Sequence, residues 1–191
     1  IIIAQDHKNN FRLDIFPEYK SHRKKVRKPI IVKPLKEYMF HNYETLTYPN
    51  LEGDDVCGIF ATQSLNKDKV VILSGDKDLR TIPGIHHFIH DESTEIVNET
   101  IANYNFMYQT LVGDMTDGFA GCPSIGGVKA SRILANKKDL PEMWEAVVKE
   151  YEKQGLDENY ALTQARLARI LRASDWDSKK KKPILWRPHA N

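Results

Sequence analysis

The sequence contains few cysteines and no long apolar run. Its 191 residues include two cysteines, Cys57 and Cys122, which form no zinc-ligand pairing and leave little room for a disulfide framework. No apolar stretch approaches the roughly 20 residues that a membrane-spanning helix needs. Hydrophobic residues make up 41% of the chain and charged residues 28%, which is ordinary for a globular protein with a real core. We therefore expect a cytoplasmic protein that works under reducing conditions and has no membrane partner.

The chain also lacks the features of a signal peptide at its start. It begins with Ile1-Ile2-Ile3, without a charged region or a cleavage site of small residues. These residues resemble the inside of a β-strand, and a central strand needs a neighbour on each side. We expect a further strand upstream that is missing from this chain.

Net charge is only +2, but the basic residues are concentrated in two segments. Between Lys8 and Lys36, ten Lys or Arg residues face two acidic residues, and a second basic run covers Lys179–Lys182. Either run could be a solvated surface. Basic segments beside acidic clusters, however, suit a polyanionic substrate that is handled through metal ions.

Eight acidic residues fall into four tight clusters, most of them just after apolar stretches. They are Asp6; Glu52, Asp54 and Asp55; Asp76 and Asp78; Asp114 and Asp117. The run 70–73 is typical of a buried strand that leads into the turn with Asp76 and Asp78. Because ligands of open α/β sheets bind at the carboxyl ends of the strands, these clusters are expected to converge. Carboxylates brought together need a compensating cation, and hard oxygen ligands favour Mg²⁺ or Mn²⁺.

The pattern along the chain predicts an α/β fold with a parallel-rich central sheet and flanking helices. Three prolines, Pro17, Pro29 and Pro34, argue against one long helix in the basic segment of about residues 8–36. We expect strands at 1–3, 45–49, 70–73 and 85–89, and helices at 35–43, from 52, at 104–112, 128–135, 140–151 and 160–171. Residues 1–112 would form the α/β unit and 113–191 a helical region.

The segment 113–127 is dense in glycine and precedes a predicted helix. Glycine lets backbone N–H groups approach phosphates closely, and the start of the helix at Val128 adds a favourable dipole. The alternative is an ordinary connecting loop.

Four motifs in this order resemble the flap endonuclease and 5′→3′ exonuclease superfamily, most closely the exonucleases of T7-like phages. They are a basic block with Pro17-Glu18-Tyr19-Lys20, then Glu52-Gly53-Asp54-Asp55, then Gly75-Asp76-Lys77-Asp78, then Gly113-Asp114 through Asp117-Gly118 with the glycine segment. The segments 168–172 and 185–188 also look like that branch. The resemblance covers nearly the whole chain and implies a PIN-like nuclease core followed by a helix-three-turn-helix region.

The resemblance also implies roles for individual residues. Four acids match the family's inner ligands for Mg²⁺ or Mn²⁺, namely Glu52, Asp54, Asp55 and Asp76, with Asp78 alongside. Asp114 and Asp117 match the ligands of its second metal position, and Asp6 matches the acid after the second strand. Arg12, Lys20 and Arg23 match basic residues over the scissile phosphate. DNA contacts are assigned to Tyr19, Lys24, Lys25, Arg27 and Lys28 in the basic segment and to Gly121, Ser124, Gly126, Gly127 and Lys129 in the glycine segment, which could also hold K⁺ through backbone carbonyls.

The function implied is a two-metal 5′→3′ exonuclease. It would act on 5′ ends or flaps of duplex DNA and on RNA–DNA hybrids, as a monomer, in the cytoplasm of bacteria or phage-infected cells. Two departures from the family stand out: the absent upstream strand usually carries a further aspartate, and Lys129 lies one place later than the family's lysine. A non-catalytic DNA-binding module is therefore the alternative. A HAD-like phosphatase, which Asp76-Lys77-Asp78 mimics, is disfavoured by Arg80, where that family has Thr or Val.

Overall fold

The computed structural model describes residues 1–25, 27 and 29–188, without the side chains of Lys24 and Lys25. The α-helices in this part of the chain are α1 (Arg12–Ile15), α2 (Val32–Asn42), α3 (Gly53–Thr62), α4 (Glu99–Val112), α5 (Gly127–Leu134), α6 (Leu140–Lys153) and α7 (Glu158–Ala168). The 3-10 helices are η1 (Ser21–Lys25), η2 (Lys77–Thr81) and η3 (Ala173–Asp175). The strands are β1 (Ile2–Ala4), β2 (Glu44–Leu46), β3 (Val71–Ser74), β4 (Gly84–Phe88), β5 (Thr94–Val97), β6 (Trp176–Asp177) and β7 (Lys182–Pro183).

The α/β class and the parallel pairing are confirmed. β1 pairs with β2 in parallel, and β3 pairs with β4 in parallel, while β5 adds to β4 in the antiparallel direction. In the described residues these strands form two separate sheets, and β6 and β7 form a third. The strand at 71–74 is half-buried rather than fully buried, because Ile72 is 3% exposed while Val71 and Leu73 are 54% and 62% exposed. Alternate side chains of a strand point to opposite faces, and only one face of β3 is covered.

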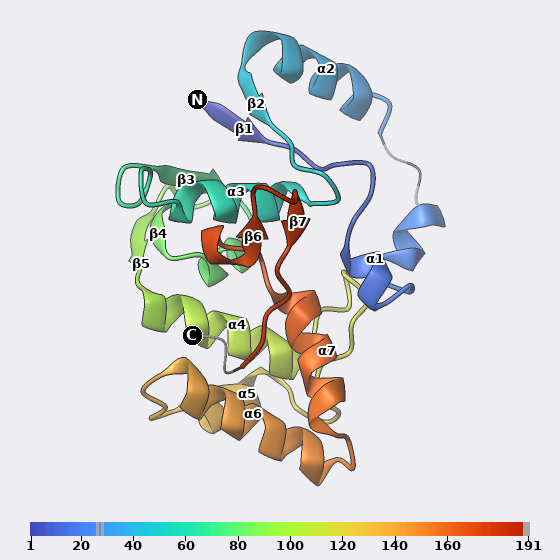
Figure 1. Cartoon of the computed structure of the whole chain (residues 1–191), viewed down its shortest axis with the longest axis vertical. Helices are drawn as coiled ribbons and strands as arrows, with labels where there is room; N and C mark the ends of the chain where they lie inside the picture. The colour runs from blue at the N-terminus through green and yellow to red at the C-terminus, as the bar shows by residue number, and fades with distance from the viewer. Residues whose placement is uncertain (26, 28, 189–191) are drawn as a thin grey trace.

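The basic segment forms no single long helix, as its prolines predict. It is divided into α1, η1 and α2. α2 lies with β1 and β2 at one end of the molecule, while α5 and α6 lie at the opposite end (Figure 1). α2 has no buried residue, so it adds surface to the molecule and no core.

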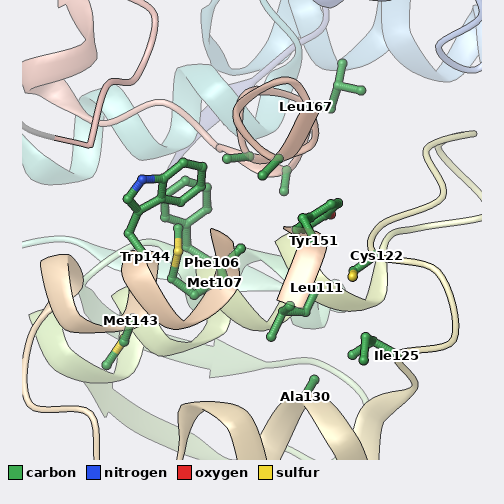
Figure 2. Packing of buried hydrophobic residues seen from close by; sticks show 14 of the residues in the cluster. Phe106, Met107, Leu111, Cys122, Ile125, Ala130, Met143, Trp144, Tyr151 and Leu167 are labelled. Carbon is green, nitrogen blue, oxygen red and sulfur yellow. The ribbon is translucent and has the colours of Figure 1, made fainter. Parts of the chain in front are cut away.

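The main hydrophobic core lies among the helices of the second half. α4 contributes Phe106, Met107 and Leu111, and α6 contributes Trp144 and Tyr151 (Figure 2). All five side chains are at most 2% exposed. This core crosses the domain boundary predicted after residue 112, because α4 packs against the helices that follow it. The two-domain division stays a prediction.

A C-terminal segment closes this core. The Trp186 ring meets Phe106 and Trp144 edge to face, with ring centroids 5.1 Å and 5.0 Å apart, respectively. Trp144 and Trp186 are therefore packing residues. Within the described residues, no helix is both long and apolar enough to span a membrane.

Several element ends differ from the predicted ones for identifiable reasons. α4 begins at Glu99, five residues before the prediction, because the Asn98 side chain accepts a hydrogen bond from the N–H of Ile101 and caps the helix. α7 ends at Ala168, three residues before the prediction, and the freed N–H of Leu171 donates to Asp55. The sequence did not predict α1 or β5.

The core makes a direct prediction for stability. Phe106→Ala should lower the free energy of unfolding by about 3–5 kcal/mol, since it removes a fully buried ring and leaves a cavity. Leu65→Ala is the control, because Leu65 is 80% exposed and its loss should cost less than about 0.5 kcal/mol. Urea unfolding followed by circular dichroism measures both values. Equal losses would contradict the position of the core.

Candidate active site

Six of the eight predicted acidic residues line one cavity of about 130 Å³. They come from the start of α3, the turn after β3 and the loop after α4. They are Glu52, Asp54, Asp76, Asp78, Asp114 and Asp117. Clusters that are far apart in the sequence thus converge, as their place after apolar elements suggested. Their roles as metal ligands stay predictions.

The other two acids do not line this cavity. Asp55 is fully buried beneath it, and Asp6 lies beside a neighbouring, mostly apolar cavity. The Asp6 carboxylate accepts a hydrogen bond from the N–H of Gly53 at 2.9 Å and pairs with Lys36 at 3.5 Å. Asp6 therefore supports the start of α3 from outside the site.

Asp55 is the partner of Arg12 in a buried ion pair. The two guanidinium nitrogens donate to the two Asp55 oxygens at 2.7 and 2.8 Å, and both side chains are at most 3% exposed. Asp55 also accepts from the N–H groups of Glu52 and Leu171. In this structure each group is buried against the other, so neither faces the cavity freely, and the assignments of Asp55 to metal and Arg12 to a phosphate stay predictions.

Arg12 makes three further contacts that reach across the fold. Its guanidinium donates to the carbonyl oxygens of Leu167 and Arg169 at 3.0 and 2.6 Å, and to Glu52 Oε2 at 3.2 Å. Arg12 thus fixes the Glu52 carboxylate from below and ties it to the end of α7.

Glu52 and Asp117 each form salt bridges with basic side chains, and together they are called the paired part of the site. Lys20 Nζ lies 2.6 Å from Glu52 Oε1 and 3.3 Å from Asp117 Oδ2, and Arg23 donates to Asp117 Oδ1 at 2.8 Å. Burial alone would raise the pKa of Glu52, but Arg12 and Lys20 hold that pKa below its ordinary value. The site therefore keeps Glu52 ionised.

Tyr19 also belongs to the paired part. Its hydroxyl lies 3.0 Å from Glu52 Oε2 and 2.8 Å from Asp117 Oδ2, and its ring is buried in the main core. Burial raises the pKa of Tyr19, so the phenol stays protonated and acts as a donor. The Tyr19 side chain is only 2% exposed in this structure, and its assignment to a DNA contact stays a prediction.

Asp54, Asp76, Asp78 and Asp114 form the unpaired part of the site. None of the four has a Lys or Arg within salt-bridge distance among the described residues. The side chain of Asp54 is partly exposed, but the surrounding protein removes much of its water. This desolvation and the negative charges of Asp76, Glu52 and Asp55 raise the pKa of Asp54 to about 7. Desolvation and Asp76 also raise the pKa of Asp78. Lys77 and Lys20 offset this effect only in part, because neither forms a salt bridge with Asp78 or Asp54 in the described part of the chain.

The donor set fits a hard cation. Oxygen ligands with excess negative charge are what Mg²⁺ and Mn²⁺ bind in proteins. Among the described residues, however, no three Asp, Glu, His or Cys side chains already stand around one common metal position. The carboxylates must therefore rotate to share an ion, and in the paired part they are held by Lys20 and Tyr19 instead.

The remaining predicted residues of the basic segment lie at the surface or outside the description. Arg23 is half-exposed and also donates to the carbonyl of Thr116 at 3.0 Å, and Arg27 is exposed. Lys28 lies outside the described residues, as do the side chains of Lys24 and Lys25.

The glycine segment divides into a buried and an exposed part. Gly121 is buried, and its N–H donates to Gln164 Oε1 at 2.9 Å, while its assignment to a DNA contact stays a prediction. Ser124 and Gly126 are exposed, and Lys129 Nζ donates to the Ser124 carbonyl at 2.9 Å. Gly127 starts α5, where an added Cβ would meet the Tyr108 hydroxyl.

Two polar residues of the cavity were not predicted. Thr116 donates to Asp114 Oδ1 through both its N–H and its hydroxyl, at 2.6 and 2.7 Å. Its position between two predicted acids was an available signal. Gln109, on α4, lines the cavity and hydrogen-bonds Asp78. No sequence motif marks it, because neighbouring positions of α4 serve the core.

The sequence of this chain is similar to those of known exonucleases. The sequence pattern of the 5′-3′ exonuclease N-terminal, resolvase-like domain matches residues 1–107. The exonuclease of Escherichia phage T7 is 31% identical over 222 residues, which cover 98% of this chain and 74% of the T7 protein. The exodeoxyribonuclease of Enterobacteria phage T3 is 29% identical over 224 residues, with 100% of this chain and 74% of the T3 protein covered.

Solved structures support the fold. The phage T5 D15 protein co-crystallized with metal ions has a TM-score of 0.66 and 17% sequence identity, with 88% of this chain and 75% of the T5 chain covered. The T5 D15 flap endonuclease in a pseudo-enzyme-product complex with DNA and metal ions has the same TM-score at 18% identity, with coverages of 88% and 73%. The likeness confirms the PIN-like α/β core, while the helix-three-turn-helix assignment stays a prediction.

The raised pKa of Asp54 predicts how stability depends on pH in metal-free protein. The folded state keeps the Asp54 proton up to about pH 7, whereas the unfolded chain releases it near its ordinary pKa of about 4. The contribution of Asp54 to the free energy of unfolding should therefore fall as pH rises from about 4 to about 7. Asp54→Asn removes this dependence, so the variant should gain stability relative to wild type across that interval. Urea unfolding in EDTA measures the difference, and a constant difference would refute the assignment.

Substitution of the adjacent acid should have the opposite effect. Asp55→Asn removes the buried bidentate partner of Arg12, which keeps only the longer contact with Glu52, and should lower the free energy of unfolding by about 3–5 kcal/mol at pH 7. Asp54→Asn is the matched control, since it makes the same change one residue earlier and should not destabilise the protein. Thermal melting in EDTA compares the two. Similar melting temperatures would contradict the structural role of Asp55.

Proposed function

The chain belongs to the 5′-3′ exonuclease family and is a nuclease, and we propose that it cleaves DNA from 5′ ends with the help of two divalent metal ions, Mg²⁺ or Mn²⁺. The observation that carries the proposal is the convergence of six carboxylates from three separated segments on one small cavity. Excess negative charge of this kind has no structural use in an apo protein, because it raises the pKa of Asp54 instead of stabilising the fold.

DNA is the substrate that this site and its surroundings favour. The basic segment borders the cavity through Lys20 and Arg23, and phosphate contacts supply most of the affinity of proteins for DNA. The T5 relative that was solved with DNA and metal ions supports the same substrate. In the described residues, nothing in the cavity would distinguish one base from another, so recognition should follow the duplex end and its backbone.

The six carboxylates are the residues that would hold metal. Bound divalent ions would activate a water and stabilise the charge on the attacking and leaving oxygens. We assign the unpaired acids Asp54, Asp76, Asp78 and Asp114 to binding of one ion, and Glu52 and Asp117 to the second. Asp55 orients the start of α3 through Arg12 and binds no metal.

Charged side chains beside the carboxylates would bind the substrate phosphate. Lys20 and Arg23 are the two cations that line the cavity and remain partly exposed. A cation placed where negative charge develops stabilises the transition state more than the ground state. We therefore assign Lys20 to transition-state stabilisation and Arg23 to phosphate binding, and Arg12 to positioning of Glu52.

The exposed edge of the glycine segment would hold the duplex away from the cleavage point. Ser124, Gly126, Gly127 and Lys129 lie at the start of α5, where backbone N–H groups and the helix dipole favour phosphate. A K⁺ ion held by backbone carbonyls there would compete with Lys129 for the Ser124 oxygen. Lys24, Lys25, Arg27 and Lys28 would extend the contact along the DNA backbone.

The proposal also covers further substrates, the oligomeric state and the location of the protein. Phosphate-directed binding tolerates 5′ flaps and RNA–DNA hybrids as well as duplex DNA ends. We further propose a monomer that acts in the cytoplasm of a bacterium or a phage-infected cell. A non-catalytic DNA-binding module would keep the basic segment but has no use for six converging carboxylates.

The proposal predicts a separation of cleavage from binding. Asp76→Ala should reduce Mg²⁺-dependent cleavage of a 5′-labelled duplex below detection, while the dissociation constant for the duplex changes by no more than a few-fold, because basic residues supply the affinity. Glu145→Ala is the control, since Glu145 is exposed on α6 and far from the cavity lining. Single-turnover assays and fluorescence anisotropy provide the two measurements. Wild-type turnover by Asp76→Ala would refute the carboxylate assignment.

A further inference from the structure

The two sets of carboxylates in the cavity differ in their salt-bridge partners. Glu52 and Asp117 share Lys20 and Tyr19, whereas Asp54, Asp76, Asp78 and Asp114 have no salt-bridge partner among the described residues. A divalent ion entering the unpaired part meets carboxylates that form no salt bridge in the described part of the chain. An ion entering the paired part meets an ammonium group that already lies between the two ligands.

Lys20 is held in that position by more than its ion pairs. Its N–H donates to the Asp117 carbonyl at 2.8 Å, and its backbone adopts a left-handed conformation with φ of 53°. A non-glycine residue keeps this conformation only where the surroundings require it. The backbone thus anchors Lys20 to the loop after α4, and only the side chain is free to leave.

Tyr19 cannot replace Lys20 as the compensating group. Its hydroxyl lies within hydrogen-bond distance of both Glu52 and Asp117, but it has one proton to donate and no charge. Without Lys20, the two carboxylates would repel each other across the phenol. Arg12 also pairs with Glu52, and Arg23 with Asp117. The Lys20 ammonium, however, is the cation within salt-bridge distance of both carboxylates.

Building on the proposed nuclease function, we propose that Lys20 is a resident cation that occupies the second metal position until a divalent ion displaces it. An ammonium and a divalent ion at the same two carboxylates repel each other, because both are positive and only a few ångströms would separate them. The displaced ammonium stays anchored at the cavity edge and becomes available to a substrate phosphate. Release of Lys20 and completion of the metal site are then one coupled event.

Two consequences distinguish this arrangement from a lysine that only binds phosphate. The two metal ions should bind with unequal affinity, the tighter one in the unpaired part and the weaker one at Glu52 and Asp117. Removing the Lys20 ammonium should tighten the weaker step, although it should slow cleavage. A lysine that acts only on phosphate would leave metal binding without DNA unchanged.

The first experiment is Mg²⁺ calorimetry without DNA on wild type, Lys20→Met, Lys20→Arg and Lys153→Met. Lys20→Met should tighten the weaker step by about tenfold, equivalent to one lost competing interaction of about 1.4 kcal/mol. Lys20→Arg keeps a competing cation and should stay within a few-fold of wild type. Lys153 pairs with Glu150 on α6, so Lys153→Met controls for the loss of one charge elsewhere.

The second experiment observes Lys20 directly. Lysines are reductively methylated with ¹³C-formaldehyde, which keeps their charge, and the Lys20 signal is identified by its absence in Lys20→Arg. The Lys20 signal should move toward the position of exposed lysines as the weaker Mg²⁺ step saturates. Melting temperatures in EDTA confirm that the variants are folded.

The outcomes separate this inference from the proposed function. If Mg²⁺ binds and DNA is cleaved, but Lys20→Met matches wild type in affinity or the Lys20 signal stays fixed at Mg²⁺ saturation, the resident-cation inference is overturned and the nuclease assignment stands. If Mg²⁺ binds to neither protein and no cleavage occurs, both fail. Tighter Mg²⁺ binding by Lys20→Met together with a moving Lys20 signal supports the inference.

Discussion

The buried pair of Arg12 and Asp55 is the interaction on which the site depends. It joins α1 to the start of α3, and the same guanidinium reaches the carbonyls of Leu167 and Arg169 at the end of α7. Burying two charges costs more than their attraction returns unless the remaining hydrogen-bonding positions are filled. Here the geometry fills them, because Asp55 also accepts from two backbone N–H groups. Segments more than 100 residues apart are thereby fixed around Glu52.

Next to that pair, four carboxylates of the cavity form no salt bridge with a basic side chain among the described residues. Cations hold the other two, Glu52 and Asp117. Loss of water, together with the charges of Asp76, Glu52 and Asp55, raises the pKa of Asp54 to about 7. The repulsion between these charges opposes folding, so it is expected only where a ligand later removes it. Ion pairs hold Glu52 and Asp117 in place, while the four acids without a salt bridge remain available to attract divalent ions. The site can therefore be rigid and still bind metal.

The sequence carried enough information to predict the site's chemistry but not its internal partners. Acid clusters after apolar elements predicted convergence, since strand ends and helix starts meet at one edge of an α/β fold. The pairing of Arg12 with Asp55 left no local trace, because the two residues are 43 positions apart and each looks like an ordinary site residue. Nothing in the sequence indicates that Tyr19 and Gly121, both assigned to DNA contacts, are buried. They pack against α4 and α7, and no motif near either residue indicates this packing. The short β5 and α1 lack the periodicity that longer elements show.

The most direct test of the account is the location of divalent ions in crystals of the protein soaked with Mn²⁺. Anomalous diffraction marks Mn²⁺ without reference to activity. The account predicts two anomalous peaks within the carboxylate cavity, one among Asp54, Asp76, Asp78 and Asp114 and one near Glu52 and Asp117 with Lys20 displaced. Peaks that lie elsewhere, or a saturated crystal with no peak in this cavity, would contradict the claim that these carboxylates form the metal centre of a nuclease.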